Sequence, residues 1–120
     1  MLDCIMVGIG GLIGTVLRYL IGLIPFKLES GFPIKTLLIN VTGAFVISMI
    51  TALAAKNKGI DPRVTLMLKV GVCGGFTTFS TLAYESADLL QSGHVVTALA
   101  YLLSSGVLGI LAVFAAQIVF

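Results

Sequence analysis

The chain reads GVCGGFTTFST from Gly71 to Thr81, inside an apolar segment that we expect to run from about residue 62 to 90. Two adjacent glycines weaken a helix by about 1 kcal/mol each, and the hydroxyl side chains that follow compete for backbone hydrogen bonds. Irregular backbone at membrane depth survives only where it is buried in protein or lines a watery cavity. We therefore predict a helix broken near residues 74–79. Its hydroxyls favour an ion site over the alternative, which is close helix packing through small residues.

Three more apolar segments accompany this one, at about residues 2–24, 34–55 and 95–119. The chain has 120 residues, of which 58% are hydrophobic and 10% charged, whereas a soluble domain carries about a quarter charged residues. Each segment is long enough for the ~20 residues that cross a bilayer core. The sequence therefore predicts an all-α membrane protein, a single transmembrane domain (1–120) of four helices. We expect no enzymatic activity, because the helices leave no room for a soluble catalytic module.

The distribution of charge gives no firm orientation in the membrane. Four spans place both termini on one side, and the basic residues divide almost evenly between the two sides: Lys56, Lys58 and Arg63, against Lys27 and Lys35. Counting Arg18, one or two turns inside its segment, makes the division three against three. The positive-inside rule then assigns no orientation. Either the expected boundaries blur a real bias, or copies of the chain insert both ways and pair antiparallel.

Two polar residues inside the segments need partners. Asn40 is the only amide within its segment, and an unsatisfied amide in hydrocarbon costs several kcal/mol. An interhelical hydrogen bond is its simplest explanation. Arg18 shares a helix face with Gly10 and Gly14. Arg18 either snorkels to the interface or forms a positive mouth for an anion path, and the sequence leaves both open.

The groups available to line a path suit a small anion. No acidic residue lies in the middle of any segment, although a proton-coupled exporter needs a buried ionisable group. Hydroxyl and amide hydrogens donate to an anion, and the ring edge of Phe79 carries positive quadrupole charge. Nothing in composition or spacing separates fluoride from chloride.

With these residues in view, the sequence resembles the Fluc family of fluoride channels over essentially the whole chain. The resemblance is carried by GGLIGTVLRY at 10–19, TLLINVTG at 36–43 and, most specifically, GVCGGFTTFST at 71–81. It implies a passive, fluoride-selective channel that protects the cell by exporting fluoride. It also implies an antiparallel homodimer of dual-topology subunits with two pores, in a cell membrane that is a bacterial inner membrane.

The family pattern assigns roles to residues of this chain. It implies a structural sodium ion, held by the backbone carbonyls of Gly74 and Thr77. It implies an anion pathway formed by Asn40, Phe79, Ser80, Thr81, Tyr101 and Ser105. It also implies that Arg18 supplies the positive charge at the mouth of this pathway. Leu82 stands where the family has a second phenylalanine, which puts the second ring-edge site in doubt.

Two other functions compete with the channel. Small proton-coupled multidrug exporters are also short four-helix chains, but they need a glutamate in the first helix. The first apolar segment of this chain contains no glutamate. A pure assembly subunit without transport is the other possibility. Fluoride efflux from liposomes, with chloride as the control, separates the three.

Overall fold

A computed structural model describes all 120 residues of the protein and contains helices and turns only. The helices are α1 (Leu2–Gly22), α2 (Ile34–Lys56), α3 (Pro62–Leu66), the π-helix η1 (Met67–Cys73), α4 (Gly74–Phe76), α5 (Phe79–Gln91) and α6 (Val95–Val119). Four stretches are long and apolar enough to cross a membrane, and the third of them, Pro62–Gln91, combines α3, η1, α4 and α5. The predicted all-α membrane fold with four spans and a broken third span is therefore confirmed.

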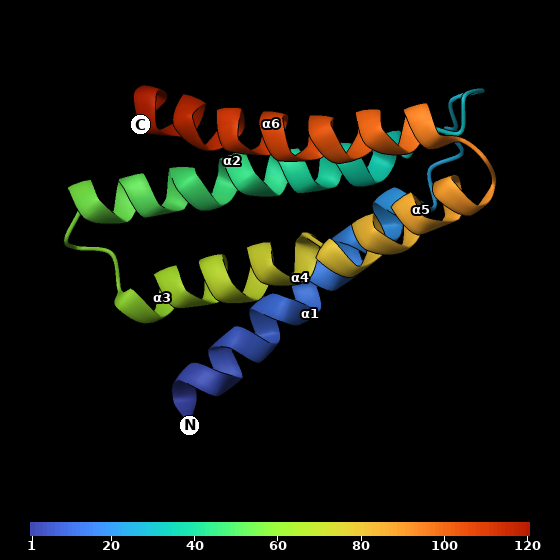
Figure 1. The fold of residues 1–120 in the computed structure, drawn as a ribbon. Coiled ribbons are helices and arrows are strands. Elements are labelled where there is room, and N and C mark those ends of the chain that lie inside the picture. The colour runs from blue at the N-terminus through green and yellow to red at the C-terminus, as the bar shows by residue number, and fades with distance from the viewer.

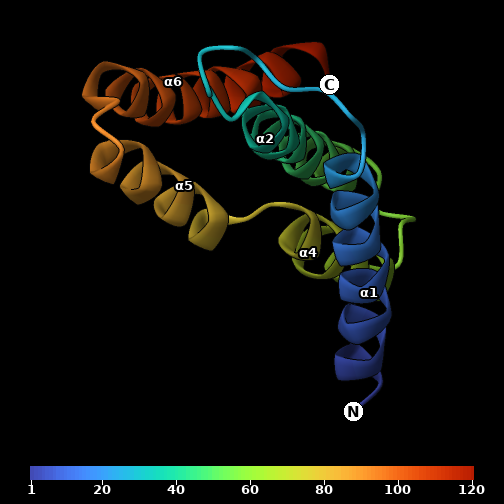
Figure 2. The ribbon, with the colours of Figure 1, turned by 90° about the vertical axis from the view of Figure 1, so that its right-hand side faces the viewer.

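The four spans pack as two pairs. α2 and α6 lie side by side along their length, while α1 crosses the first half of the third span (Figure 1). α5 leaves that pair after the break and runs toward α6 (Figure 2). Both termini lie at the same end of the molecule, as four spans require. Most large apolar side chains remain exposed on the outside of the chain, which is the surface that lipid or a second protein chain covers.

The break in the third span lies at two threonines. Thr77 (φ −83°, ψ 155°) and Thr78 (φ −149°, ψ 119°) are extended and separate α4 from α5. Gly74 is helical (φ −63°, ψ −39°) and Gly75 lies within α4. The break thus falls within the predicted residues 74–79, but the glycines do not cause it. Threonine side chains that bond to the backbone take that role.

Glycines instead allow α1 to approach the third span closely. A Cβ atom on Gly10 would lie 2.5 Å from the carbonyl oxygen of Met67, and one on Gly75 would lie 2.6 Å from that of Gly11. Gly71 is equally tight, with Val7 O at 2.8 Å. These glycines therefore allow close helix packing, which was the alternative to an ion site when the sequence alone was considered. A Cβ atom on Gly74, by contrast, would meet nothing nearer than 4.0 Å.

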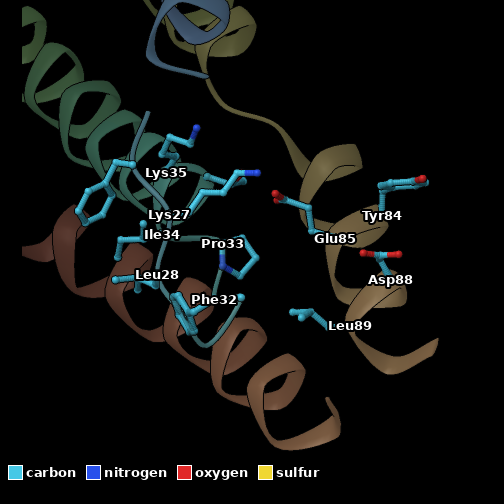
Figure 3. Close-up of a pocket in the computed structure, with 13 residues that line it drawn as sticks. Lys27, Leu28, Phe32, Pro33, Ile34, Lys35, Tyr84, Glu85, Asp88 and Leu89 are labelled. Carbon is cyan, nitrogen blue, oxygen red and sulfur yellow. The ribbon is translucent and has the colours of Figure 1, made fainter. Parts of the chain in front are cut away.

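Lys35 holds the turn that follows α1. Its Nζ donates to the carbonyl oxygens of Gly22, at 2.9 Å, and Ile24, at 3.1 Å. These belong to the last turn of α1 and the residues after it, where carbonyls lack helical partners and a cation is favourable. Lys35 thereby fixes one wall of a cavity that lies between this turn and α5 (Figure 3).

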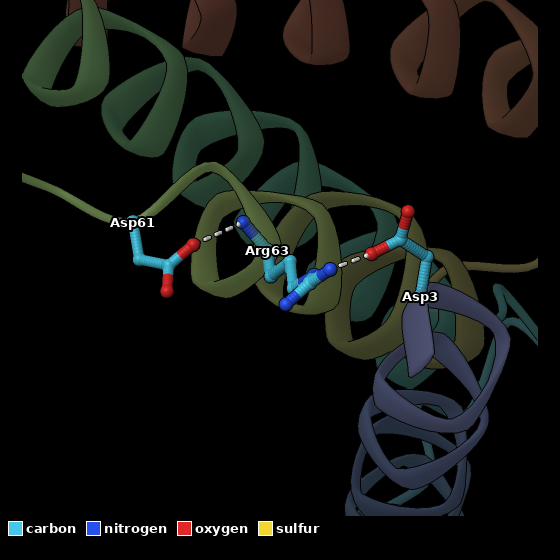
Figure 4. Close-up of polar contacts among 3 residues, drawn as sticks. All are labelled: Asp3, Asp61 and Arg63. Atoms are coloured by element: carbon cyan, nitrogen blue, oxygen red, sulfur yellow. Dashed lines mark hydrogen bonds and ion pairs between the residues drawn. The ribbon is translucent and has the colours of Figure 1, made fainter. Parts of the chain in front are cut away.

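The opposite end of the molecule is tied by charged groups. The carboxylate of Asp61 accepts a hydrogen bond from the backbone N–H of Arg63 at 2.9 Å and caps α3. The guanidinium of Arg63 then reaches Asp3 on α1 at 3.0 Å (Figure 4). Both side chains of this ion pair are more than half exposed, so the pair contributes at most about 1 kcal/mol to stability.

Candidate functional site

Asn40 holds the backbone of the break from α2. Its Oδ1 accepts from the N–H of Thr78 at 2.8 Å, and its Nδ2 donates to the carbonyl of Thr78 at 3.1 Å. The interhelical hydrogen-bond partner expected for this amide is therefore the backbone of Thr78, in the break. Because an amide NH₂ group carries two hydrogens and the structure uses only one, Asn40 retains a donor for a ligand.

Arg18 reaches the same region from α1. Its Nε donates to the carbonyl oxygen of Gly75 at 3.1 Å, in a partly buried contact. That carbonyl lies in the last turn before the break, where a positive charge is favourable. Gly10 and Gly14 on the same face of α1 are buried, which agrees with the shared face predicted from their spacing. Neither interpretation of Arg18 from the sequence anticipated this partner.

The hydroxyl groups at the break mostly serve the backbone. Thr77 Oγ1 donates to the carbonyl of Cys73 at 2.9 Å. Thr78 caps α5, because its Oγ1 accepts from the N–H of Thr81 at 3.1 Å, and it also donates to Thr81 Oγ1. Ser80 lies exposed on the surface of the chain. Phe79 next to it is 80% exposed, so its ring is free to meet a partner or a ligand.

Several carbonyl oxygens at the break, those of Gly74, Phe76 and Thr77, accept no hydrogen bond outside the regular helices. Gly74 and Thr77 line an open groove against α2, of about 290 Å³, together with Asn40 and Gly43. A side chain in place of Gly43 would collide with the methyl group of Thr77. The glycine thus lets the break lie directly on α2, with oxygen atoms that suit a hard cation.

Tyr101 and Ser105 lie on α6, which packs mainly on α2 and α5. Tyr101 is fully buried, and its hydroxyl donates to Glu85 Oε1 at 2.9 Å. The ring of Phe32 meets the Tyr101 ring edge to face, at a centroid distance of 5.5 Å. Ser105 Oγ is the one buried side-chain polar atom without a hydrogen-bond partner. Such a hydroxyl requires an explanation, and a passing ligand supplies one.

The sites predicted from the sequence therefore form two groups in the structure. Asn40, Arg18 and the residues of the break come together at α4 and α5, whereas Tyr101 and Ser105 form a separate stripe on α6. Leu82, at the position of the family's second phenylalanine, packs against the buried cluster around Tyr101.

Two hydrogen-bond partners of the predicted site residues were not anticipated from the sequence. Glu85 is half-buried and bonded to Tyr101, and Thr78 is the partner of Asn40. Their separations from those partners, 16 and 38 residues, leave no local pattern that would have revealed them.

Comparison with known proteins assigns the chain to a family. A family model described as "CrcB-like protein, Camphor Resistance (CrcB)" matches residues 5–117. A protein from Chlorobium phaeobacteroides (strain BS1) named "Fluoride-specific ion channel FluC" is 40% identical over 110 residues, which cover 92% of this chain and 86% of that protein. Proteins of the same name from Chlorobaculum tepidum and Methanopyrus kandleri are 42% and 45% identical, covering 88% and 89% of this chain and 83% and 80% of their own lengths. This multi-pass membrane protein belongs to the CrcB family.

Proposed function

We propose that the protein is a fluoride-selective channel that exports fluoride passively, down its electrochemical gradient. The observation that carries the proposal is 40–45% identity, over nearly the whole chain, to proteins named fluoride-specific ion channels. Hydrogen fluoride crosses membranes uncharged and ionises in neutral cytosol. The trapped anion then leaves through the channel, driven by the membrane potential, and the cell is protected. The protein acts in the cell membrane and catalyses no reaction.

The chemistry of the spans supports an anion as the transported species. Three side-chain groups of the spans that remain free are donors or a ring edge: the second amide hydrogen of Asn40, the unpartnered hydroxyl of Ser105 and the exposed ring of Phe79. We assign the anion pathway to these three residues together with Ser80, Thr81 and Tyr101, with Arg18 as the charge near its mouth. A proton-coupled exporter is disfavoured, since no carboxylate lies in the middle of any span.

We further propose that two copies pair antiparallel as a dual-topology homodimer. The almost even division of lysine and arginine between the two sides supports insertion in both orientations. The exposed Phe79 and Ser80 beside the break also support a partner, because these groups would otherwise face lipid. Single-cysteine labelling from each side of the membrane tests the proposal, and labelling from one side alone would exclude it.

Within that dimer, we propose a structural sodium ion at the break. The carbonyl oxygens of Gly74 and Thr77 would hold it, contributed by both copies. Support comes from the absence of other hydrogen bonds to these oxygens across the break and from the open space around Gly74. A bound cation supplies the positive charge that the freed carbonyls need at membrane depth.

Fluoride efflux from liposomes that contain the purified protein is the direct test of function. The liposomes are loaded with potassium fluoride, and a potassium ionophore removes the membrane voltage that fluoride efflux would otherwise build up. A fluoride electrode follows the fluoride concentration outside the liposomes. We expect rapid fluoride release and no chloride release from matched chloride-loaded liposomes. Absence of fluoride release would overturn the proposed function, and equal release of both anions would overturn the selectivity.

A further inference from the structure

A cavity of about 450 Å³ lies between the turn after α1 and the outer part of α5. Its two walls carry opposite charges. Lys27 and Lys35 belong to the wall formed by the turn and the start of α2, and Glu85 and Asp88 belong to the wall formed by α5 (Figure 3). The residues of the turn that line the cavity, Phe26, Lys27, Leu28 and Gly31, are exposed.

The two lysines differ in what their ammonium groups do. Lys35 is bound to the carbonyl oxygens of Gly22 and Ile24 and is held against the end of α1. Lys27 has neither a hydrogen bond nor an ion pair. Its side chain extends into the cavity toward the carboxylate of Glu85, as Figure 3 shows, without reaching ion-pair distance. Lys27 is thus the uncommitted positive charge of the cavity.

Glu85 connects this cavity to the polar stripe on α6. Its carboxylate accepts the hydrogen bond of Tyr101 at 2.9 Å, and one helical turn further along α6 lies the unpartnered hydroxyl of Ser105. Glu85 itself lines the cavity, so an anion that followed this stripe past Tyr101 would reach the cavity at Glu85. There it faces the carboxylates of Glu85 and Asp88, which repel it unless a positive charge offsets them.

We infer that this cavity is an anion-binding vestibule for small monovalent anions and that Lys27 supplies the charge that attracts them. The inference rests on the proposed channel function, and it assigns a role to a side chain that lies outside the proposed pathway. Lys35 acts as a positioning residue that keeps the turn, and with it Lys27, opposite α5.

Charge neutralisation at Lys27 provides the test. Fluoride efflux is measured from liposomes containing purified dimers of the wild type, Lys27→Gln, Lys27→Arg and Lys58→Gln, at about 10 mM and about 1 M of a salt with an impermeant anion. These conditions give Debye lengths of roughly 30 Å and 3 Å. Lys58 is the matched control, because it is an exposed lysine without a partner in the turn at the other end of the molecule.

The expected result depends on salt. A unit charge about 6 Å from an anion in water-like surroundings changes the local anion concentration roughly threefold. Lys27→Gln should therefore lose about two thirds of the flux at low salt and match the wild type at high salt. Lys27→Arg and Lys58→Gln should match the wild type in both. Each variant is compared with itself at the two salt concentrations, so differences in membrane insertion cancel.

Two results would overturn the inference while the channel function stands. One is a fluoride-conducting wild type whose flux Lys27→Gln leaves unchanged at low salt. The other is an equal loss at low and high salt, which would indicate a structural role for the side chain. A wild type that releases no fluoride would instead overturn the proposed function, and the vestibule with it.

Discussion

Substituting alanine for Gly75 tests how closely α1 approaches the third span. The new Cβ atom would lie 2.6 Å from the carbonyl oxygen of Gly11 and 3.0 Å from Thr15 Oγ1. The nearest of these atoms belongs to the backbone, so α1 itself has to move. Overpacking of this kind costs about 1–3 kcal/mol. The movement also strains the hydrogen bond from Arg18 on α1 to the Gly75 carbonyl, which contributes about 1 kcal/mol.

Helix propensity acts in the opposite direction and decides the size of the net effect. Alanine is favoured over glycine inside a helix by about 1 kcal/mol. The expected net loss for Gly75→Ala is therefore about 1–3 kcal/mol in the free energy of unfolding. Gly8→Ala is the matched control on α1, because a Cβ atom there would meet nothing within 4 Å. That variant should be unchanged or gain up to about 1 kcal/mol.

Unfolding of the purified protein in mixed micelles, titrated with sodium dodecyl sulfate and followed by helical circular dichroism, measures the difference. If the glycine pair only weakened the helix, as the sequence suggested, alanine at Gly75 would strengthen it and raise the midpoint. A lowered midpoint for Gly75→Ala and an unchanged or raised one for Gly8→Ala is the result expected from the structure. A midpoint for Gly75→Ala at or above the wild type would refute the close approach.

Three further predictions concern the ion sites. Asn40→Asp should abolish most fluoride flux, because it removes the donor to the Thr78 carbonyl and places a negative charge beside the proposed anion path. Near-normal efflux would show that Asn40 does not line the path. Phe79→Ile should greatly reduce fluoride efflux while size-exclusion chromatography still shows the proposed dimer, because the exposed ring makes few packing contacts within the chain but offers a positive edge to an anion. Unchanged efflux would mean that the hydroxyl groups alone carry the ion. Replacing sodium by N-methylglucamine over long equilibration should weaken the proposed dimer, whereas Thr77→Ser should not, because backbone oxygens would bind the proposed cation. Equal dimer dissociation in both solutions would exclude the site.

The four membrane spans could be predicted from the sequence because each depends on one strong property, a long run of apolar residues. Long apolar stretches bounded by charged or turn residues define helices in a membrane regardless of their neighbours. α2 and α6, for example, begin at the expected residues 34 and 95. α1 ends at Gly22, two residues before the expected end of its segment. The π-helix at Met67–Cys73 carries no sequence signal of its own and was not anticipated.

The break shows where prediction from sequence fails. Gly71 and Gly75 have the same four-residue spacing as Gly10 and Gly14, and the two pairs pack against each other's helices. That repeated spacing was a readable signal for helix contact, although adjacent glycines suggested weakness instead. The contact of Arg18 with Gly75 joins residues 57 positions apart. Contacts at such separation depend on how whole helices pack, which no local pattern specifies.

The way the backbone of the break is hydrogen-bonded bears on both of the ion sites proposed there. Side chains from α1 and α2 provide partners for the carbonyls of Gly75 and Thr78 and for the N–H of Thr78. The groups left over on the side of α4 are carbonyl oxygens, at the negative end of a helix dipole. On the side of α5, the backbone N–H groups of Phe79 and Ser80 make no hydrogen bond outside the regular helices, and they lie at a positive end. A cation at the first and an anion at the second would each meet the charge it needs, with only two extended threonines between them.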